Sequence, residues 1–170
     1  MSYPSAMLNA LALLLLANPA PAAPPTFSDV AVYNGAWTIT ATKTMAGAGK
    51  TDSLVNHCTQ GSAYYACEQV VNGKPMALIV FVPAEAPLTY HTQPVLPNGS
   101  AAGRGDLTIS GDHWTFLGKD TEGDKTTWYR TENYFTGKDK IHFEQFESSD
   151  NKTTWKMTNS GDEVRVANIP

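Results

Sequence analysis

The sequence predicts an all-β domain in which an antiparallel up-and-down meander closes into a β-barrel, with a two-sheet β-sandwich as the alternative. From Tyr33 onward, no segment carries the apolar stripe of an amphipathic helix. Runs rich in Val, Ile, Thr, Tyr, Phe and Trp alternate instead with short turn signals. Because a long meander leaves two open edges unless it closes on itself, these hairpins favour the barrel.

The beginning of the chain predicts a secretory signal peptide over residues 1–22. Its apolar centre, residues 8–17, is too short to span a bilayer, and Ala20-Pro21-Ala22 matches the A-x-A cleavage pattern. We expect residues 23–32 to form a flexible N-terminal segment and residues 33–167 to form a single barrel domain. These features predict an exported protein, periplasmic or secreted, without a membrane span.

The first expected hairpin pairs residues 36–43 with residues 50–60, and its loop contains Gly-Lys-Thr after a glycine-rich run. A phosphate-binding loop needs a first glycine five residues before the second, but Thr44 occupies that position relative to Gly49. Both flanking segments also alternate like strands, whereas a phosphate-binding loop leads into a helix. The sequence therefore predicts a hairpin loop here.

Cys58 and Cys67 lie on either side of a turn signal, Gln60-Gly61-Ser62. Residues that face each other across an antiparallel pair can reach disulfide distance, and disulfides persist in oxidising compartments. A redox or metal pair is the other interpretation, but the C-x-x-C spacing is missing. We expect a structural disulfide.

The remaining strands follow in order, joined by short turns such as Asn72-Gly73 and Gly111-Asp112. Flanking prolines make residues 87–94 an expected edge strand or loop-like segment. Gly161-Asp162 is expected to be a turn. The other expected strands are 64–71, 77–82, 106–110, 113–118, 125–135, 140–148, 153–158 and 163–166.

Residues 76–82 are apolar throughout, a pattern typical of a strand that is buried on both faces. In a barrel this strand would face an apolar cavity on one side and a cover on the other, such as the N-terminal segment or a second copy in a homodimer. In a sandwich it would be a central strand packed on both sides.

The order of several motifs adds a resemblance to a known family. Asn34-Gly35-Ala36-Trp37 opens the first strand, the two-cysteine hairpin follows, and Gly111-Asp112 precedes Trp114. Residues 143–155 and a last strand carrying Gly161 and Arg165 complete the series. Over residues 33–166 the chain resembles exported bacterial lipocalin-like proteins of an uncharacterised domain family. The resemblance implies a calycin-type β-barrel and no particular activity.

The strand over residues 125–135 offers two faces, of which one combines an Arg–Glu pair with aromatic side chains. If this face points inward, it can orient the polar end of a ligand inside an apolar cup. If it points outward, it is a surface ion pair of small consequence. On the inward interpretation, the expected ligand-binding residues are Trp114, Phe116, Trp128, Arg130, Glu132, Tyr134 and Phe143.

The sequence carries no complete catalytic or metal-binding motif. His142 and Glu144 share one face of a strand, but no H-x-H, H-E-x-x-H or G-x-S-x-G pattern accompanies them. We therefore expect no cofactor, no metal and no assigned catalytic residue. The net charge of −4 provides no basic surface for nucleic acid.

Three functions follow from these features. The first is a binding module that holds a small apolar or amphipathic ligand in the barrel cup. The second is an interaction or envelope-structural protein whose barrel is filled by its own side chains. The third is a hydrolase- or isomerase-type enzyme that uses the same cup, with Glu132, His142 or Glu144 as the base.

Overall fold

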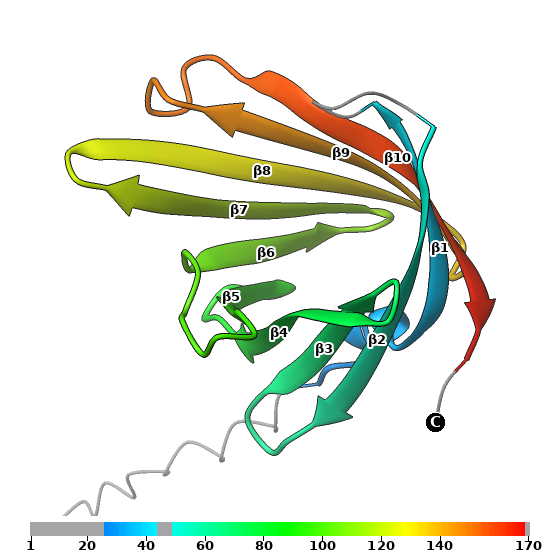
Figure 1. The fold of residues 1–170 in the computed structure, drawn as a ribbon. Coiled ribbons are helices and arrows are strands. Elements are labelled where there is room, and N and C mark those ends of the chain that lie inside the picture. The colour runs from blue at the N-terminus through cyan, green and yellow to red at the C-terminus, as the bar shows by residue number, and fades with distance from the viewer. Residues whose placement is uncertain (1–25, 44–48, 169–170) are drawn as a thin grey trace, which may run out of the picture.

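A computed structural model describes residues 26–43 and 49–168, which form ten antiparallel strands in one closed barrel (Figure 1). This confirms the predicted all-β meander and excludes the two-sheet sandwich. The expected signal peptide and residues 44–48 of the first loop lie outside the described residues. The strands are β1 Gly35–Lys43, β2 Thr51–Gln60, β3 Tyr65–Val71, β4 Lys74–Pro83, β5 Thr89–Val95, β6 Gly105–Ser110, β7 His113–Glu122, β8 Lys125–Thr136, β9 Lys140–Ser148 and β10 Lys156–Ala167.

Each strand pairs with the next one along the chain, and β10 returns to pair with β1. The tight turns occur where the sequence supplies residues that accept a positive φ. Asn72 and Gly73, with φ of 50° and 74°, join β3 to β4. Across the β2–β3 pair, Cys58 and Cys67 face each other in register and form the predicted disulfide.

The contact between β1 and β10 closes the barrel, and the two strands approach closely at Gly161. Gly161 pairs with Ala41, and a Cβ atom added to it would lie 2.4 Å from the carbonyl oxygen of Thr40. The expected turn at Gly161-Asp162 is therefore wrong. Here glycine permits the close approach of two strands, and β10 continues through both residues.

The expectation of an edge strand or loop near residues 87–94 is also wrong. The segment forms β5, which pairs with β4 on one side and β6 on the other. A closed barrel has no edge, so the prolines near this strand occupy its ends and a position opposite Ile79.

A short 3-10 helix, η1 Val30–Tyr33, closes one end of the barrel together with the residues before it (Figure 1). Phe27 and Val30 are 2% and 0% exposed. The described part of the segment expected to be flexible, residues 26–32, is instead packed against the barrel core. Around it lie buried side chains from many strands, including Trp37, Leu107, Trp114, Phe135 and Ile141.

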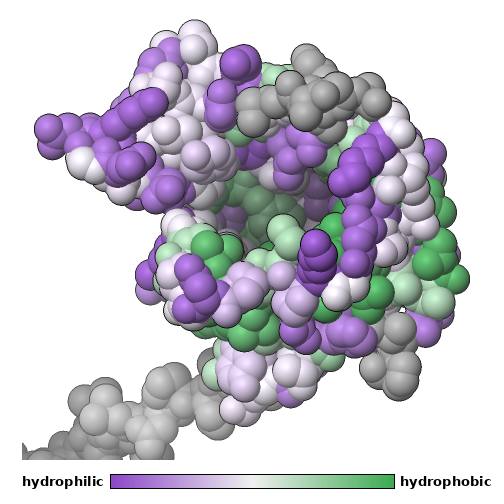
Figure 2. Space-filling model, viewed as in Figure 1, coloured by the Kyte–Doolittle hydropathy of each residue, from purple (hydrophilic) through white to green (hydrophobic). Residues whose placement is uncertain are grey.

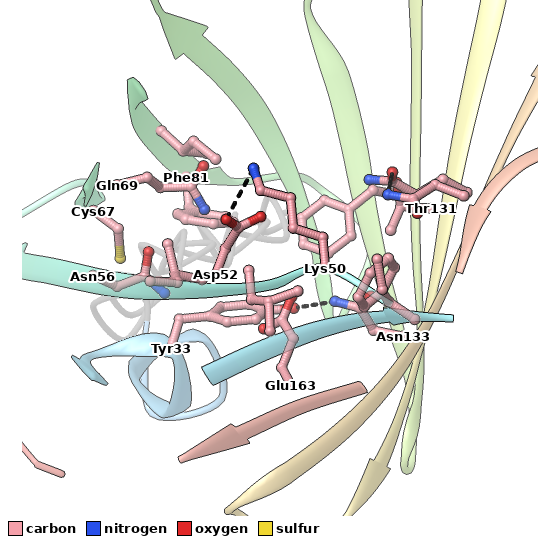
Figure 3. Close-up of a pocket in the computed structure, with 18 residues that line it drawn as sticks. Tyr33, Lys50, Asp52, Asn56, Cys67, Gln69, Phe81, Thr131, Asn133 and Glu163 are labelled. Carbon is pink, nitrogen blue, oxygen red and sulfur yellow. Dashed lines mark hydrogen bonds and ion pairs between the residues drawn. The ribbon is translucent and has the colours of Figure 1, made fainter. Parts of the chain in front are cut away.

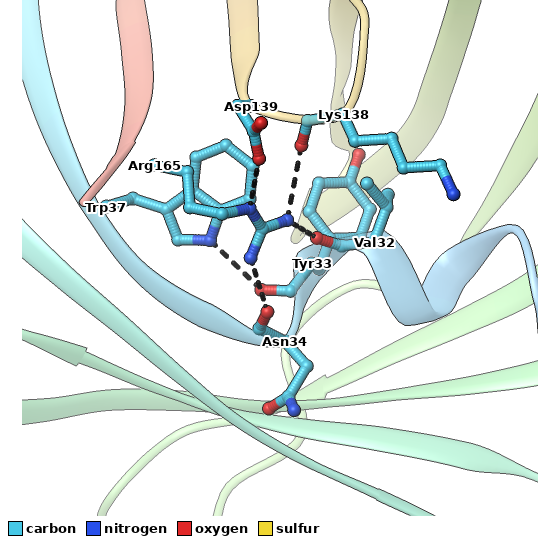
Figure 4. A network of polar contacts seen from close by, with 7 residues as sticks. All are labelled: Val32, Tyr33, Asn34, Trp37, Lys138, Asp139 and Arg165. Carbon is cyan, nitrogen blue, oxygen red and sulfur yellow. Dashed lines mark hydrogen bonds and ion pairs between the residues drawn. The ribbon is translucent and has the colours of Figure 1, made fainter. Parts of the chain in front are cut away.

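Arg165 fastens this closed end (Figure 4). Its guanidinium donates hydrogen bonds to the carbonyl oxygens of Val32, Asn34 and Lys138, and to the carboxylate of Asp139 at 2.9 Å. It also lies over the ring of Trp37, 4.1 Å from the ring centroid. One side chain thereby links η1, β1, β10 and the β8–β9 turn.

The apolar segment 76–82 is not buried on both faces. Ile79 and Phe81 point inward, and Phe81 belongs to the core. On the outward face, Met76, Leu78 and Val82 are 51%, 41% and 41% exposed. The expected cover is therefore absent from the described part of the chain, and β4 leaves an apolar strip on the outer surface.

Candidate functional site

The barrel encloses a cavity of about 480 Å³ that opens to solvent on the side shown in Figure 2. The core side chains fill the end near η1, and the cavity occupies the space above Tyr33. In Figure 2 the hollow has hydrophobic surface inside it and hydrophilic residues around its rim. Because alternate residues of each strand face the lumen, nearly all strands contribute to its lining.

Apolar side chains form much of the cavity wall. They come from five strands and surround the hollow on several sides, so a bound molecule would contact carbon atoms over much of its surface. These residues are Ile39, Leu54, Ile79, Phe81, Phe116 and Phe143.

Tyr33 lies at the floor of the cavity, where its hydroxyl accepts a hydrogen bond of 2.9 Å from Asn133 Nδ2 (Figure 3). Its ring contacts the rings of Phe81, Trp114 and Phe116. Burial raises the pKa of the Tyr33 hydroxyl well above its ordinary value of 10. Tyr33 therefore remains a neutral hydrogen-bonding group at physiological pH.

Three asparagine side chains in the cavity wall each present a buried oxygen atom without a hydrogen-bond donor among the described residues. Asn56 and Asn133 are 2% and 6% exposed, and the Oδ1 atom of each lacks a partner. The Oδ1 atom of Asn159, which also lines the cavity, is in the same state. Leaving a buried acceptor unsatisfied costs about 1–3 kcal/mol, which a ligand's N–H or O–H group could recover.

Glu163 projects from β10 into the cavity beside Tyr33 (Figure 3). Within the described part of the chain it has no ion-pair or hydrogen-bond partner, and it faces Ile39 of β1 and Ile141 of β9 in the strand register. Burial raises its pKa from 4.5 to about 7, because the apolar surroundings disfavour the charged form.

Lys50 and Asp52 lie together in the cavity lining, with Nζ 3.1 Å from Oδ1. Asn72 Nδ2 donates a second, 2.6 Å hydrogen bond to Asp52. The hydrogen bonds from Asn72 and then Lys50 lower the pKa of Asp52 below its usual value. Asp52 is therefore ionised at neutral pH and keeps Lys50 paired.

Of the seven residues predicted to bind a ligand, Phe116 and Phe143 line the cavity. Trp114 also points inward but lies in the core below, where its ring meets Tyr33 edge-on at 5.5 Å. Its indole N–H donates to the carbonyl of Gly111. Trp114 thus supports the cavity floor rather than its open wall.

The other four, Trp128, Arg130, Glu132 and Tyr134, lie on the outer face of β8, so the inward interpretation of this face is wrong and the outward interpretation is the one that the structure shows. They alternate with Thr131 and Asn133, which face the cavity. These four side chains point outward because the outer surface of β7–β10 offers them aromatic and charged partners. On that surface they form ion pairs, cation–π contacts and ring stacking with neighbouring side chains.

Arg130 illustrates this outer surface. Its guanidinium lies between the rings of Phe146 and Trp155, 4.6 and 4.5 Å from their centroids. Its Nε is 3.0 Å from Glu132, which also accepts a 2.6 Å hydrogen bond from Thr115. The cation–π contacts with Phe146 and Trp155 therefore hold Arg130 on the outer surface of the barrel.

The candidate bases also lie on the outer face. His142 is 3.1 Å from Asp162 and 4.0 Å from Glu144, and none of these residues lines the cavity. Within residues 26–43 and 49–168, no group of three His, Cys, Asp or Glu side chains is arranged to hold a metal ion. No helix among the described residues is long and apolar enough to cross a bilayer.

Sequence reasoning missed the polar residues that face the cavity: Tyr33, Asn56, Asn133 and Glu163. Alternation does place Asn133 on the face opposite Arg130 and Glu132, but the inward interpretation assigns the face of Arg130 and Glu132 to the lumen. In β10, Val164 and Val166 are 44% and 63% exposed, whereas Glu163 points inward. The two-residue period of a strand shows which residues share a face, but nothing in the sequence marks which of the two faces points into the barrel.

The fold is shared with a solved structure. The crystal structure of Rv2717c from M. tuberculosis has a TM-score of 0.53 to this chain, with 13% sequence identity. The match covers 84% of this chain and 98% of that one. At this identity the likeness concerns the fold alone. No protein-family model and no curated protein matches the chain.

Proposed function

We propose that this chain is an exported, lipocalin-like binding protein that holds one small amphipathic ligand in its barrel cavity. The observation that carries the proposal is the combination of a cavity of about 480 Å³ with buried amide oxygens that lack donors. Cavities of about 300–1,000 Å³ with apolar walls and a few polar groups are the usual form of a small-molecule site.

Several observations favour this function over the alternatives. A barrel filled by its own side chains would leave no such cavity. The bases expected for an enzyme, Glu132, His142 and Glu144, do not line it. The disulfide between Cys58 and Cys67 supports export, because disulfides persist outside the reducing cytosol.

The test is a titration of the disulfide-bonded protein with Nile red, a neutral apolar dye whose fluorescence rises in an apolar site. We expect saturable binding of one dye per chain. Ala41→Trp should abolish it, because Ala41 lines the cavity and an indole ring there would fill the space. Thr40→Trp is the matched control, since Thr40 is exposed and lies on the opposite face of the same strand.

Equal dye binding by both variants and the parent would overturn the proposal, as would the absence of saturable binding. Native mass spectrometry gives an independent reading, because a co-purified ligand adds mass that is lost on denaturation. A dimer mass without extra mass would instead favour the second candidate, an interaction protein that pairs through the exposed strip of Met76, Leu78 and Val82.

A further inference from the structure

The charges that line the cavity do not balance. Among the described residues its ionisable acids and bases are Lys50, Asp52 and Glu163, besides the neutral Tyr33. Lys50, the base in this described set, is paired with Asp52, and its Nζ lies 3.1 Å from the Asp52 Oδ1. Among the side chains that the structure describes, which do not include Lys43 or residues 44–48, Glu163 therefore has no counter-ion.

The neutral polar groups of the cavity also include hydrogen-bond acceptors that no described residue satisfies. The side-chain oxygens of Asn56, Asn133 and Asn159 are acceptors without a donor in the described structure. Together with Glu163, they give the cavity several hydrogen-bond acceptors that no described residue satisfies. A ligand that supplied more acceptors would leave these groups unsatisfied, whereas one that supplies donors would satisfy them.

The apolar wall limits the rest of the ligand. Phe116 and Phe143 line the same cavity as Glu163, and Ile39 is its register partner on β1. A molecule that reaches Glu163 must therefore place carbon atoms against aromatic and branched side chains. Aromatic rings next to a carboxylate also favour a cation, through the negative charge on the ring faces.

We propose that the cavity selects small amphipathic amines, whose ammonium group contacts the carboxylate of Glu163 while the apolar part lies against Phe116 and Phe143. This inference rests on the proposed binding function and specifies its ligand class. Charge-assisted hydrogen bonds are about twice as strong as neutral ones, so Glu163 would discriminate by the head group rather than by the apolar part.

Binding of a cation also has a consequence for protons. Glu163 has a pKa of about 7 in the free protein, so part of the population is protonated at neutral pH. An ammonium group lowers that pKa because it stabilises the carboxylate. Amine binding at pH 7 therefore releases protons from Glu163. Near that pH Tyr33 stays neutral because burial raises its pKa, and Asp52 stays ionised because its hydrogen bonds lower its pKa.

The experiment compares three probes that share one apolar chain and differ in their head groups: decylamine, 1-decanol and decanoate. Each is titrated by calorimetry, or by displacement of Nile red, at pH 8 against the disulfide-bonded protein. We expect decylamine to bind about 10- to 100-fold more tightly than 1-decanol, and decanoate to bind most weakly. Calorimetry of decylamine at pH 7, in buffers of different ionisation enthalpy, should show net proton release.

Glu163→Gln should remove the preference for decylamine over 1-decanol while leaving the affinity for 1-decanol within a few-fold. Glu122→Gln, an exposed carboxylate on β7, is the matched control and should keep the preference. Decanoate binding as tightly as decylamine would overturn the inference, as would a preference that survives in Glu163→Gln. If 1-decanol and Nile red bind but decylamine gains nothing, the binding function stands and the amine selectivity fails. If no probe binds, the binding function itself fails.

Discussion

Replacing Glu163 with Gln should make the protein more stable above neutral pH and leave it unchanged in acid. The folded protein raises the pKa of this carboxyl from 4.5 to about 7, so the folded state holds its proton over a pH range in which the unfolded chain has lost it. Its contribution to stability is fully present below about pH 4.5 and is lost as the pH rises through about 7. Glutamine never ionises and escapes this loss.

The size of the effect follows from the two pKa values. A difference of one pKa unit corresponds to about 1.4 kcal/mol, so the interval between 4.5 and about 7 sets an upper value of about 3 kcal/mol. The cavity opens to solvent, and water that enters it screens part of the cost. We therefore expect Glu163→Gln to gain about 1–3 kcal/mol at pH 8, or about 3–10 °C in Tm for a chain of this size.

The assay is thermal and urea unfolding of the parent, Glu163→Gln and the exposed control Glu122→Gln, each at pH 4.5, 6, 7 and 8 with the disulfide intact. The stability difference between Glu163→Gln and the parent should be near zero at pH 4.5, grow through pH 6 and 7, and level off by pH 8. Glu122→Gln should follow the parent throughout. A constant difference at all four pH values, or a loss of stability at pH 8, would refute the reasoning, because burial of the charged form predicts neither.

Two further predictions concern the closed end and the disulfide. Arg165→Ala should lower the free energy of unfolding in urea by about 3–5 kcal/mol, because it removes the stack on Trp37 and leaves three carbonyl groups without their hydrogen-bond donor. Arg104 is exposed, and Arg104→Ala should lower that free energy by less than about 0.5 kcal/mol. Equal losses in the two variants would contradict this role of Arg165. Reduction of the Cys58–Cys67 disulfide should cost about 2–3 kcal/mol, and an unchanged Tm in dithiothreitol would show that the hairpin does not need it.

The fold was accessible from the sequence because its signals are local. Turn residues such as Asn72-Gly73, the alternation within each strand and the spacing of Cys58 and Cys67 act over a few residues, and the structure follows them. The Gly161-Asp162 pair gave a wrong turn prediction because a local pattern does not show contacts between distant residues. Gly161 is needed for its close approach to the carbonyl of Thr40, which lies on the neighbouring strand β1 and far away in sequence.

The site was less accessible because alternation fixes which residues share a face and leaves open which face is inside. In a packed core the more apolar face is the inner one. Here the inner face of β8 carries Thr131 and Asn133 because it borders a cavity, and the outer face carries Trp128 and Arg130 because these residues stack on their neighbours. A cavity and an aromatic outer surface together invert the usual rule.

Glu163 is an ionisable side chain on the inner face of β10, where a packed core would have an apolar residue. A carboxyl group that faces a cavity without a counter-ion among the described side chains costs the folded protein stability above neutral pH, and a glutamine of nearly equal size would avoid the cost. Among the described residues the same group is the unpaired carboxyl of the cavity lining, so it could distinguish an amine from an alcohol of the same shape. If Glu163→Gln both stabilises the protein at pH 8 and removes the preference for decylamine, one buried charge accounts for both effects. The stability measurement then gives the cost of holding the unpaired carboxylate, and the affinity difference gives the part of that cost that a bound amine recovers.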